Sequence, residues 1–144
     1  MLINMIPTYY FFFLKIISFD MISGTTDIRW APDSRHIITL AEYSVKLTIW
    51  SLIQKLVRYI KLPKRKECVA FSPDGNYLSV VERKQNKDCL SIFACSKDWG
   101  IARQFELYPD MDTLGLKWHP KSDLIVAYSS KLQCVACVYA LDGR

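Results

Sequence analysis

Glycine, proline and histidine are scarce in this chain. It has 5 glycines, 6 prolines and 2 histidines in 144 residues. We find no phosphate-binding glycine loop, no dinucleotide-binding glycine run and no calcium loop. His36 and His119 each stand beside a predicted turn, and no nucleophile or carboxylate recurs at a useful spacing from them. We therefore expect no enzymatic activity and no cofactor.

A second CxxC motif, which could complete a metal site, is also lacking. The chain has 5 cysteines. An odd number without a convincing secretory signal indicates reduced thiols in an intracellular protein. Cys134 and Cys137 form a single CxxC, but in a predicted strand their odd separation sends the two thiols to opposite faces. No paired histidines supply further ligands, so we expect no metal site.

Charge of one sign dominates only mildly. The formal net charge is +5, with 51% hydrophobic and 13% aromatic residues, which is typical of a folded domain. The excess of positive charge lies entirely after residue 24, because Lys15 and Asp20 cancel before it. No basic helix or groove motif accompanies this charge. We favour a role in solubility over nucleic-acid binding.

The segment 1–24 differs from the rest because it is apolar and almost uncharged. Lys15 interrupts a membrane span, and a signal peptide would need a basic start and a small-residue cleavage site. We interpret it as an unrelated start joined to the middle of a longer protein. A membrane anchor for a small β domain is the alternative.

A pattern of an aromatic residue, a turn and an apolar run occurs three times after residue 24. The first aromatics are Trp30, Phe71 and Trp118, with steps of 41 and 47 residues between them. A second aromatic followed by a small residue lies 20, 22 and 21 residues further on, as Trp50-Ser51, Phe93-Ala94 and Tyr139-Ala140. Regular spacing of this kind indicates an array of one small structural unit.

Each unit is predicted to be a blade of four short antiparallel strands, and the fold class is all-β. The predicted strands are 27–30, 36–40, 46–50 and 55–60, then 69–71, 77–81, 89–94 and 101–107, then 114–118, 124–128 and 133–139. The blades cover 25–66, 67–108 and 109–144, and the last is incomplete. Turns are expected at 72–75 and 86–88, and Asp33, Asp74 and Asp88 are expected to bond their own backbones.

These units resemble WD repeats, and the chain is therefore expected to be part of a larger β-propeller. The Trp-Asp pair of the family is degenerate here, and its Gly-His pair is missing. Of the buried hydrogen-bond network of the family, only Asp88 and Ser79 have plausible counterparts. We therefore expect the blades to depend more on apolar packing than on that network.

Several longer runs resemble one centrosomal and spindle-pole branch of the family. The most specific are Tyr59 to Lys64 and Lys87 to Ser96. The resemblance implies a cytoplasmic, non-enzymatic scaffold that supports microtubule minus-end anchoring and spindle or cilium assembly, together with a coiled-coil partner. A generic WD-repeat adaptor in another complex is the alternative. Neither nucleic acid nor membrane is an expected partner.

Basic residues are the only candidate contacts for such a partner. The run 61–66 falls between two blades, in a predicted surface loop, and a second cluster falls in the next loop. The candidates are Lys61, Lys64, Arg65, Lys66, Arg83, Lys84 and Lys87. A solvated loop is the ordinary interpretation. The sharper one is contact with an acidic surface, such as a tubulin tail or an acidic helix.

Overall fold

The computed structural model describes residues 24–54, 57–129 and 135–141, and in these residues all the regular structure except two 3-10 turns is β-strand. The first sheet contains β1 (Thr25–Trp30), β2 (His36–Ala41), β3 (Lys46–Ser51) and β4 (Val57–Lys61). The second contains β5 (Val69–Phe71), β6 (Tyr77–Lys84), β7 (Lys87–Ala94) and β8 (Gly100–Glu106). The third contains β9 (Thr113–Trp118), β10 (Leu124–Ser129) and β11 (Ala136–Ala140).

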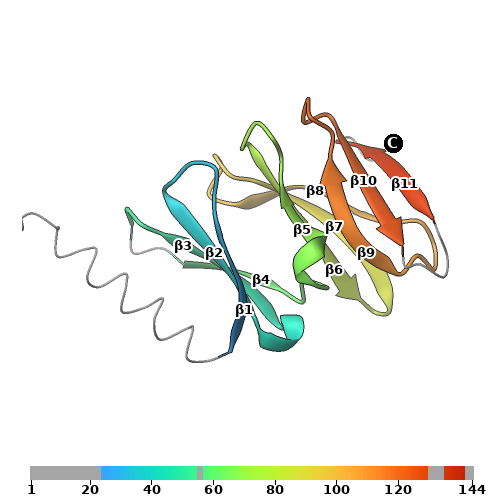
Figure 1. The fold of residues 1–144 in the computed structure, drawn as a ribbon, viewed down its shortest axis with the longest axis horizontal. Helices are drawn as coiled ribbons and strands as arrows, with labels where there is room; N and C mark the ends of the chain where they lie inside the picture. The colour runs from blue at the N-terminus through green and yellow to red at the C-terminus, as the bar shows by residue number, and fades with distance from the viewer. Residues whose placement is uncertain (1–23, 55–56, 130–134, 142–144) are drawn as a thin grey trace, which may run out of the picture.

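Each sheet is an antiparallel meander in which neighbouring strands in the sequence are neighbours in the sheet. The three sheets stand one behind another in chain order (Figure 1). The all-β prediction is confirmed. The predicted segment 1–24 lies outside the described residues except for Gly24, as do Cys134 of the CxxC and the first residues of the predicted strands 55–60 and 133–139.

The second sheet is buried on both faces because its strands alternate apolar residues toward the two neighbouring sheets. Leu78 and Val80 join a core cluster with the first sheet, while Val81 and Leu90 join another with the third sheet. A meander with four buried side chains of this size gains free energy from each of them, about 1.5–3 kcal/mol apiece. Sheet stacking therefore defines the fold.

The turns at one end of the sheets share a conformation, as the repeat predicts. Gly75 has a φ of +73°, and Ser34 and Ser122 at the equivalent positions have φ values of 56° and 62°. These turns also meet one another: the Asp74 amide donates to Ser122 Oγ at 3.1 Å. They form the upper edge of the molecule in Figure 1.

The turn predicted at 86–88 is wrong, because the structure has it at residues 85–86. Gln85 and Asn86 have φ values of 49° and 66°, and Lys84 pairs with Lys87 across them. Two central residues with positive φ make the tight hairpin whose twist matches the flanking strands. Asp88 therefore lies in β7 rather than in a turn, and it does not bond its own backbone as predicted, whereas Asp33 and Asp74 do.

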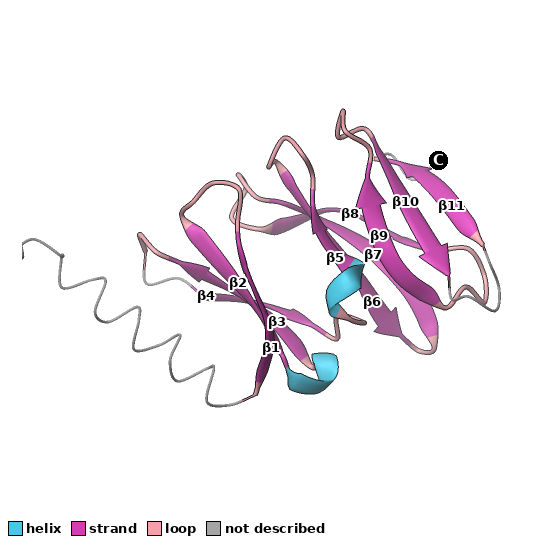
Figure 2. Cartoon of the chain, viewed as in Figure 1, coloured by secondary structure: helices cyan, strands magenta, loops and turns pink. Residues whose placement is uncertain are grey.

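Two short 3-10 helices mark the opposite end of the sheets. They are η1 (Glu42–Ser44), between β2 and β3, and η2 (Lys66–Cys68), before β5 (Figure 2). Backbone bonds join the β4–β5 linker to β6, since the Lys64 amide donates to the Val81 carbonyl at 2.8 Å. The end carrying η1, η2 and the β6–β7 hairpin is called the hairpin end below.

Candidate functional site

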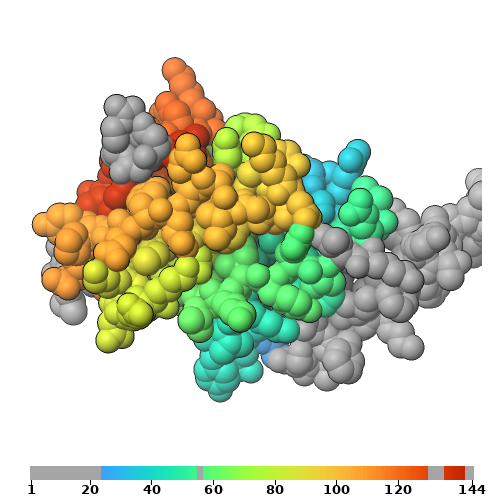
Figure 3. All heavy atoms as spheres, turned by 180° about the vertical axis from the view of Figure 1, so that it is seen from behind, coloured from blue at the N-terminus to red at the C-terminus, as the bar shows by residue number. Residues whose placement is uncertain are grey.

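The hairpin end is formed by four segments of the chain, and the predicted contact residues lie in or beside two of them, the linker 62–68 and the β6–β7 hairpin. The four segments are the β2–β3 turn, the linker 62–68, the β6–β7 hairpin and the linker 107–112. Figure 3 views the molecule from behind, with the β2–β3 turn and the β6–β7 hairpin along its lower edge. Segments that are far apart in the sequence therefore share one surface.

Two cations of the first basic run are available on this surface. Lys61 is exposed at the end of β4, and Arg65 is half-buried just before η2. Among the described residues, neither has a carboxylate partner. Lys66 is exposed and lies 4.0 Å from Glu67. These cations could meet an acidic partner without breaking a strong internal ion pair.

Lys64 is not available as a contact, which corrects its placement in a solvated surface loop. Its side chain is only 6% exposed, and its Nζ donates to Asp88 Oδ2 and to Asp112 Oδ1, each at 2.6 Å. Asp88 Oδ2 also accepts the Thr113 amide at 2.8 Å. An isolated charge is costly to bury. The ammonium group of Lys64 offsets that cost by neutralising the buried Asp88 carboxylate.

The second basic cluster lies on strands rather than in a loop, and its members diverge. Arg83 Nη1 lies 3.1 Å from Asp112 Oδ1, while Lys84 pairs with Glu82 at 3.1 Å. Lys87 pairs with Glu106 at 3.0 Å across β7 and β8. Side chains alternate between the faces of a strand, so Arg83 and Lys84 point to opposite sides. Only Arg83 joins the first basic run.

An exposed apolar patch was missed by the sequence reasoning. Tyr43 is 89% exposed, and Val45 and Leu62 are more than half exposed. Tyr43 and Leu62 line one hollow of about 320 Å³ together with Arg65 and Arg83. Tyr43 and Leu62 also have positive φ values of 58° and 54°, which cost energy for residues with a Cβ. A tyrosine between the predicted strands 36–40 and 46–50 was the available signal.

The histidines and Cys68 in the described part of the chain give little indication of nucleophilic catalysis. His36 Nδ1 lies 2.6 Å from Asp33 and His119 Nδ1 lies 2.6 Å from Asp123, but both pairs belong to surface turns. The hydrogen bond from His119 lowers the pKa of Asp123. Burial raises the pKa of the Cys68 thiol to about 12, which keeps it protonated.

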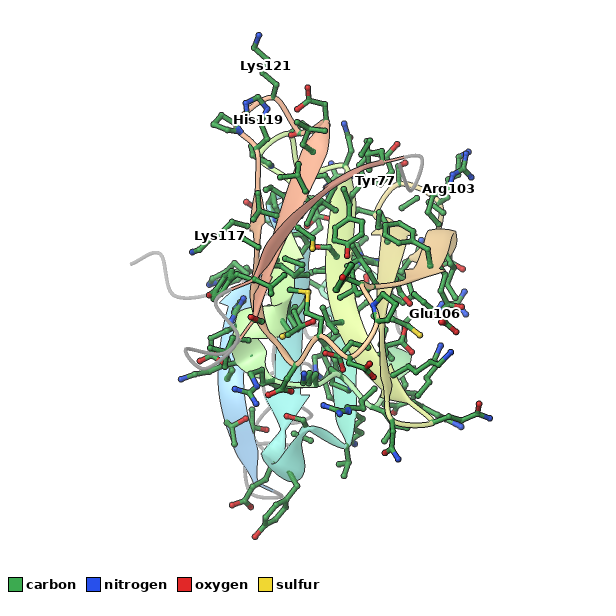
Figure 4. All side chains as sticks on the ribbon, turned by 90° about the vertical axis from the view of Figure 1, so that its right-hand side faces the viewer. Tyr77, Arg103, Glu106, Lys117, His119 and Lys121 are labelled. Atoms are coloured by element: carbon green, nitrogen blue, oxygen red, sulfur yellow. The ribbon has the colours of Figure 1, made fainter. Side chains whose placement is uncertain are left out.

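Other features of the described residues define no separate chemical site. A hollow of about 630 Å³ lies between β8 and the end of β11 and is lined by Tyr77 and Arg103, which Figure 4 shows on the same side. Cys137 packs half-buried in β11, and within the described ranges no group of three potential metal ligands occurs. No helix among these residues is long and apolar enough to span a bilayer.

No family model matches this chain. Two known WD repeat-containing proteins are similar to it in sequence. The WD repeat-containing protein WRAP73 of Mus musculus is 40% identical over 123 residues, 85% of this chain and 26% of the mouse protein. An uncharacterized WD repeat-containing protein of Schizosaccharomyces pombe is 27% identical over 122 residues, 82% of this chain and 25% of that protein. The chain thus spans about a quarter of the length of these relatives.

Solved structures share the fold at low sequence identity. A crystal structure of the eukaryotic initiation factor superposes with a TM-score of 0.64 at 15% identity, over 84% of this chain and 31% of that chain. Hydrazine synthase of Kuenenia stuttgartiensis superposes with a TM-score of 0.58 at 17% identity, over 83% of this chain and 33% of that chain. The fold alone therefore does not separate enzymes from scaffolds.

The stacked antiparallel meanders and their repeated turns are blades of the β-propeller type. Over most of its length the chain is similar to WD repeat-containing proteins of mouse and fission yeast.

Proposed function

We propose that the chain is part of a non-enzymatic protein-interaction scaffold at the centrosome or spindle pole. WD-repeat proteins generally act as such scaffolds, and the similarity to WRAP73 supports that class of function. The runs 59–64 and 87–96 resemble WD repeat-containing protein eight, a centrosomal and spindle-pole protein. The scaffold would support microtubule minus-end anchoring and spindle or cilium assembly.

The observation that carries this proposal is the apolar patch beside unpaired cations at the hairpin end. Tyr43 and Leu62 offer apolar area that a partner can cover; Arg65 lines the same hollow, and the exposed Lys61 precedes Leu62 in the chain. An aromatic anchor with a polar rim is the usual composition of an energetic centre in a protein interface. A coiled-coil partner with acidic residues flanking an apolar stripe would match this surface.

Charge reversal of Lys61 and Arg65 to glutamate in one fluorescently tagged chain tests this proposal. We expect spindle-pole foci for the unchanged chain and their loss in the variant, with loss of the captured partner in a pull-down at physiological salt. Lys64 is left unchanged because its reversal would bury a second carboxylate beside Asp88. The matched control reverses Lys117 in β9 and Lys121 in the β9–β10 turn, which are both exposed (Figure 4).

Three outcomes would contradict the proposal. Equal foci and partner capture in both variants would show that the hairpin end is not the docking surface. Diffuse fluorescence of the unchanged chain would favour a generic adaptor in another complex. Carbonate-resistant membrane association would favour the membrane-anchored alternative.

A further inference from the structure

A second hollow at the hairpin end is rich in carboxylates. It encloses about 220 Å³ between the β6–β7 hairpin and the linker 107–112. The charged residues lining it are Asp88, Glu106, Asp110, Asp112, Arg83 and Lys87. Lys64, which contacts Asp88 and Asp112 from outside this lining, is a third cation, so the four carboxylates leave a small excess of negative charge. We call it the carboxylate hollow.

One oxygen of Asp88 has no hydrogen-bond donor. The Asp88 side chain is 2% exposed, and its Oδ2 accepts both Lys64 Nζ and the Thr113 amide. Its Oδ1 is buried and accepts no hydrogen bond among the described residues. A buried acceptor left without a donor is costly, so the site favours a guest that donates hydrogen bonds.

Arg83 shows what kind of group fits beside this oxygen. Its Nη1 lies 3.7 Å from Asp88 Oδ1, too far for a hydrogen bond, and 3.1 Å from Asp112 Oδ1. The Arg83 side chain is 45% exposed, so it covers the hollow from the solvent side. A guanidinium that enters from outside could take this place and reach the free oxygen when Arg83 moves aside.

The walls of the hollow suit the rest of an arginine side chain. Tyr108 is 60% exposed, and its ring could stack on a planar guanidinium. Leu107 and Met111 provide apolar wall for the methylene groups. The hydrogen bond from Lys64, together with Arg83, lowers the pKa of Asp112, which keeps this carboxylate charged at neutral pH.

We propose that the carboxylate hollow binds an arginine side chain presented by a protein partner of the scaffold. The guanidinium donates to Asp88 Oδ1 and pairs with Asp112, replacing Arg83 there. Arginine fits better than lysine because its planar fork can bond two carboxylates at once. This inference rests on the proposed scaffold function, and it gives that partner a basic residue beside the acidic ones that meet Lys61 and Arg65.

Titration of the isotope-labelled full chain with N-acetyl-arginine amide, followed by amide NMR shifts, tests the proposal. We expect saturable shifts confined to residues 83–88 and 106–113. N-acetyl-citrulline amide, which has nearly the same shape without the charge, should give none. No saturable shift with the arginine probe, or equal shifts with both probes, would overturn the proposal.

The Arg83→Gln variant is expected to bind the arginine probe more tightly, not more weakly. Removing the internal competitor should tighten binding of the arginine probe about threefold to fivefold, the worth of one exposed ion pair. Arg103→Gln, at an exposed arginine on β8, is the matched control and should leave the affinity unchanged. Unchanged or weaker binding by Arg83→Gln, with the chain still showing a dispersed spectrum, would contradict the proposal.

The two proposals can fail separately. Binding of the arginine probe without spindle-pole foci would remove only the centrosomal function. Foci and partner capture without probe binding would remove only the arginine site.

Discussion

The two interfaces between the sheets are built differently. The first joins β1–β4 to β5–β8 through an apolar cluster that includes Ile49, Leu78 and Phe93. The polar groups that cross it lie at its rim: Arg29 donates to the carbonyls of Val69 and Lys66 at 2.6 and 2.7 Å, and its side chain is about one-third exposed. This interface keeps its charges near water.

The second interface has an apolar cluster too, but a buried ion pair closes its hairpin end. Lys64 from the linker before β5 contacts Asp88 in β7 and Asp112 in the linker before β9. The Thr113 amide of β9 donates to the same Asp88 carboxylate. Apolar faces can slide over one another, whereas a buried charge accepts only one partner position. We infer that the ion pair fixes the position of the third sheet against the second.

Breaking the buried pair should have the largest effect on stability. Lys64→Met leaves the Asp88 carboxylate buried without its cation, and we expect the free energy of unfolding to fall by about 3–5 kcal/mol. Urea denaturation of the full chain measures this. Lys61→Met, at an exposed lysine three residues earlier, should change it by less than about 0.5 kcal/mol. Similar small losses for both variants would show that the pair does not organise the interface.

A cavity in the first interface should cost somewhat less and should not depend on charge. Leu78 is fully buried there, and Leu78→Ala should lower the free energy of unfolding by about 2–5 kcal/mol. The loss should be the same at low and high salt, because only apolar contacts are removed. A loss that varied strongly with salt would mean that the two interfaces are coupled through the charges.

The indole of Trp118 offers a smaller test of the second interface. Its Nε1 donates to Ser79 Oγ at 2.9 Å and lies 3.2 Å from the Ala70 carbonyl, so it joins β9 to the second sheet. Trp118→Phe should cost about 1 kcal/mol beyond the change in packing. A double-mutant cycle with Ser79→Ala isolates the hydrogen bond. A coupling energy near zero would show that packing alone holds this edge.

The sequence predicts the first interface better than the second. Periodic apolar residues such as Leu78 and Val80 identify strands and their buried faces from spacing alone, and all eleven predicted strands have counterparts among the described elements. The buried pair escaped prediction because Lys64 and Asp88 are 24 positions apart. A lysine in a basic run is usually solvated, so only the fold could show that this one is buried.

Side-chain hydrogen bonds also contribute more to the blades than the sequence predicts. Ser79 and Asp88 do take part in partly buried hydrogen bonds, but with Trp118 and Lys64 as partners rather than with a histidine. In the first sheet the indole of Trp50 donates to Thr39 Oγ1 at 3.0 Å. Different residue types thus satisfy similar buried positions, which a search for the family's own residues does not detect.

Acid should weaken the second interface before the first, although the effect is the smallest of those considered. The hydrogen bond from Lys64 lowers the pKa of Asp112 below its ordinary value of 3.8. A carboxyl with a lowered pKa in the folded state contributes stability above its unfolded pKa and loses it as pH falls through the folded pKa. We therefore expect the urea midpoint to fall from about pH 4 downward, and less steeply in Asp112→Asn. Because the Asp112 side chain is 47% exposed, solvent screens most of this contribution. Parallel pH profiles for the two chains would show that Asp112 does not contribute, and would leave Asp88 and Thr113 as the contacts that hold the third sheet in register.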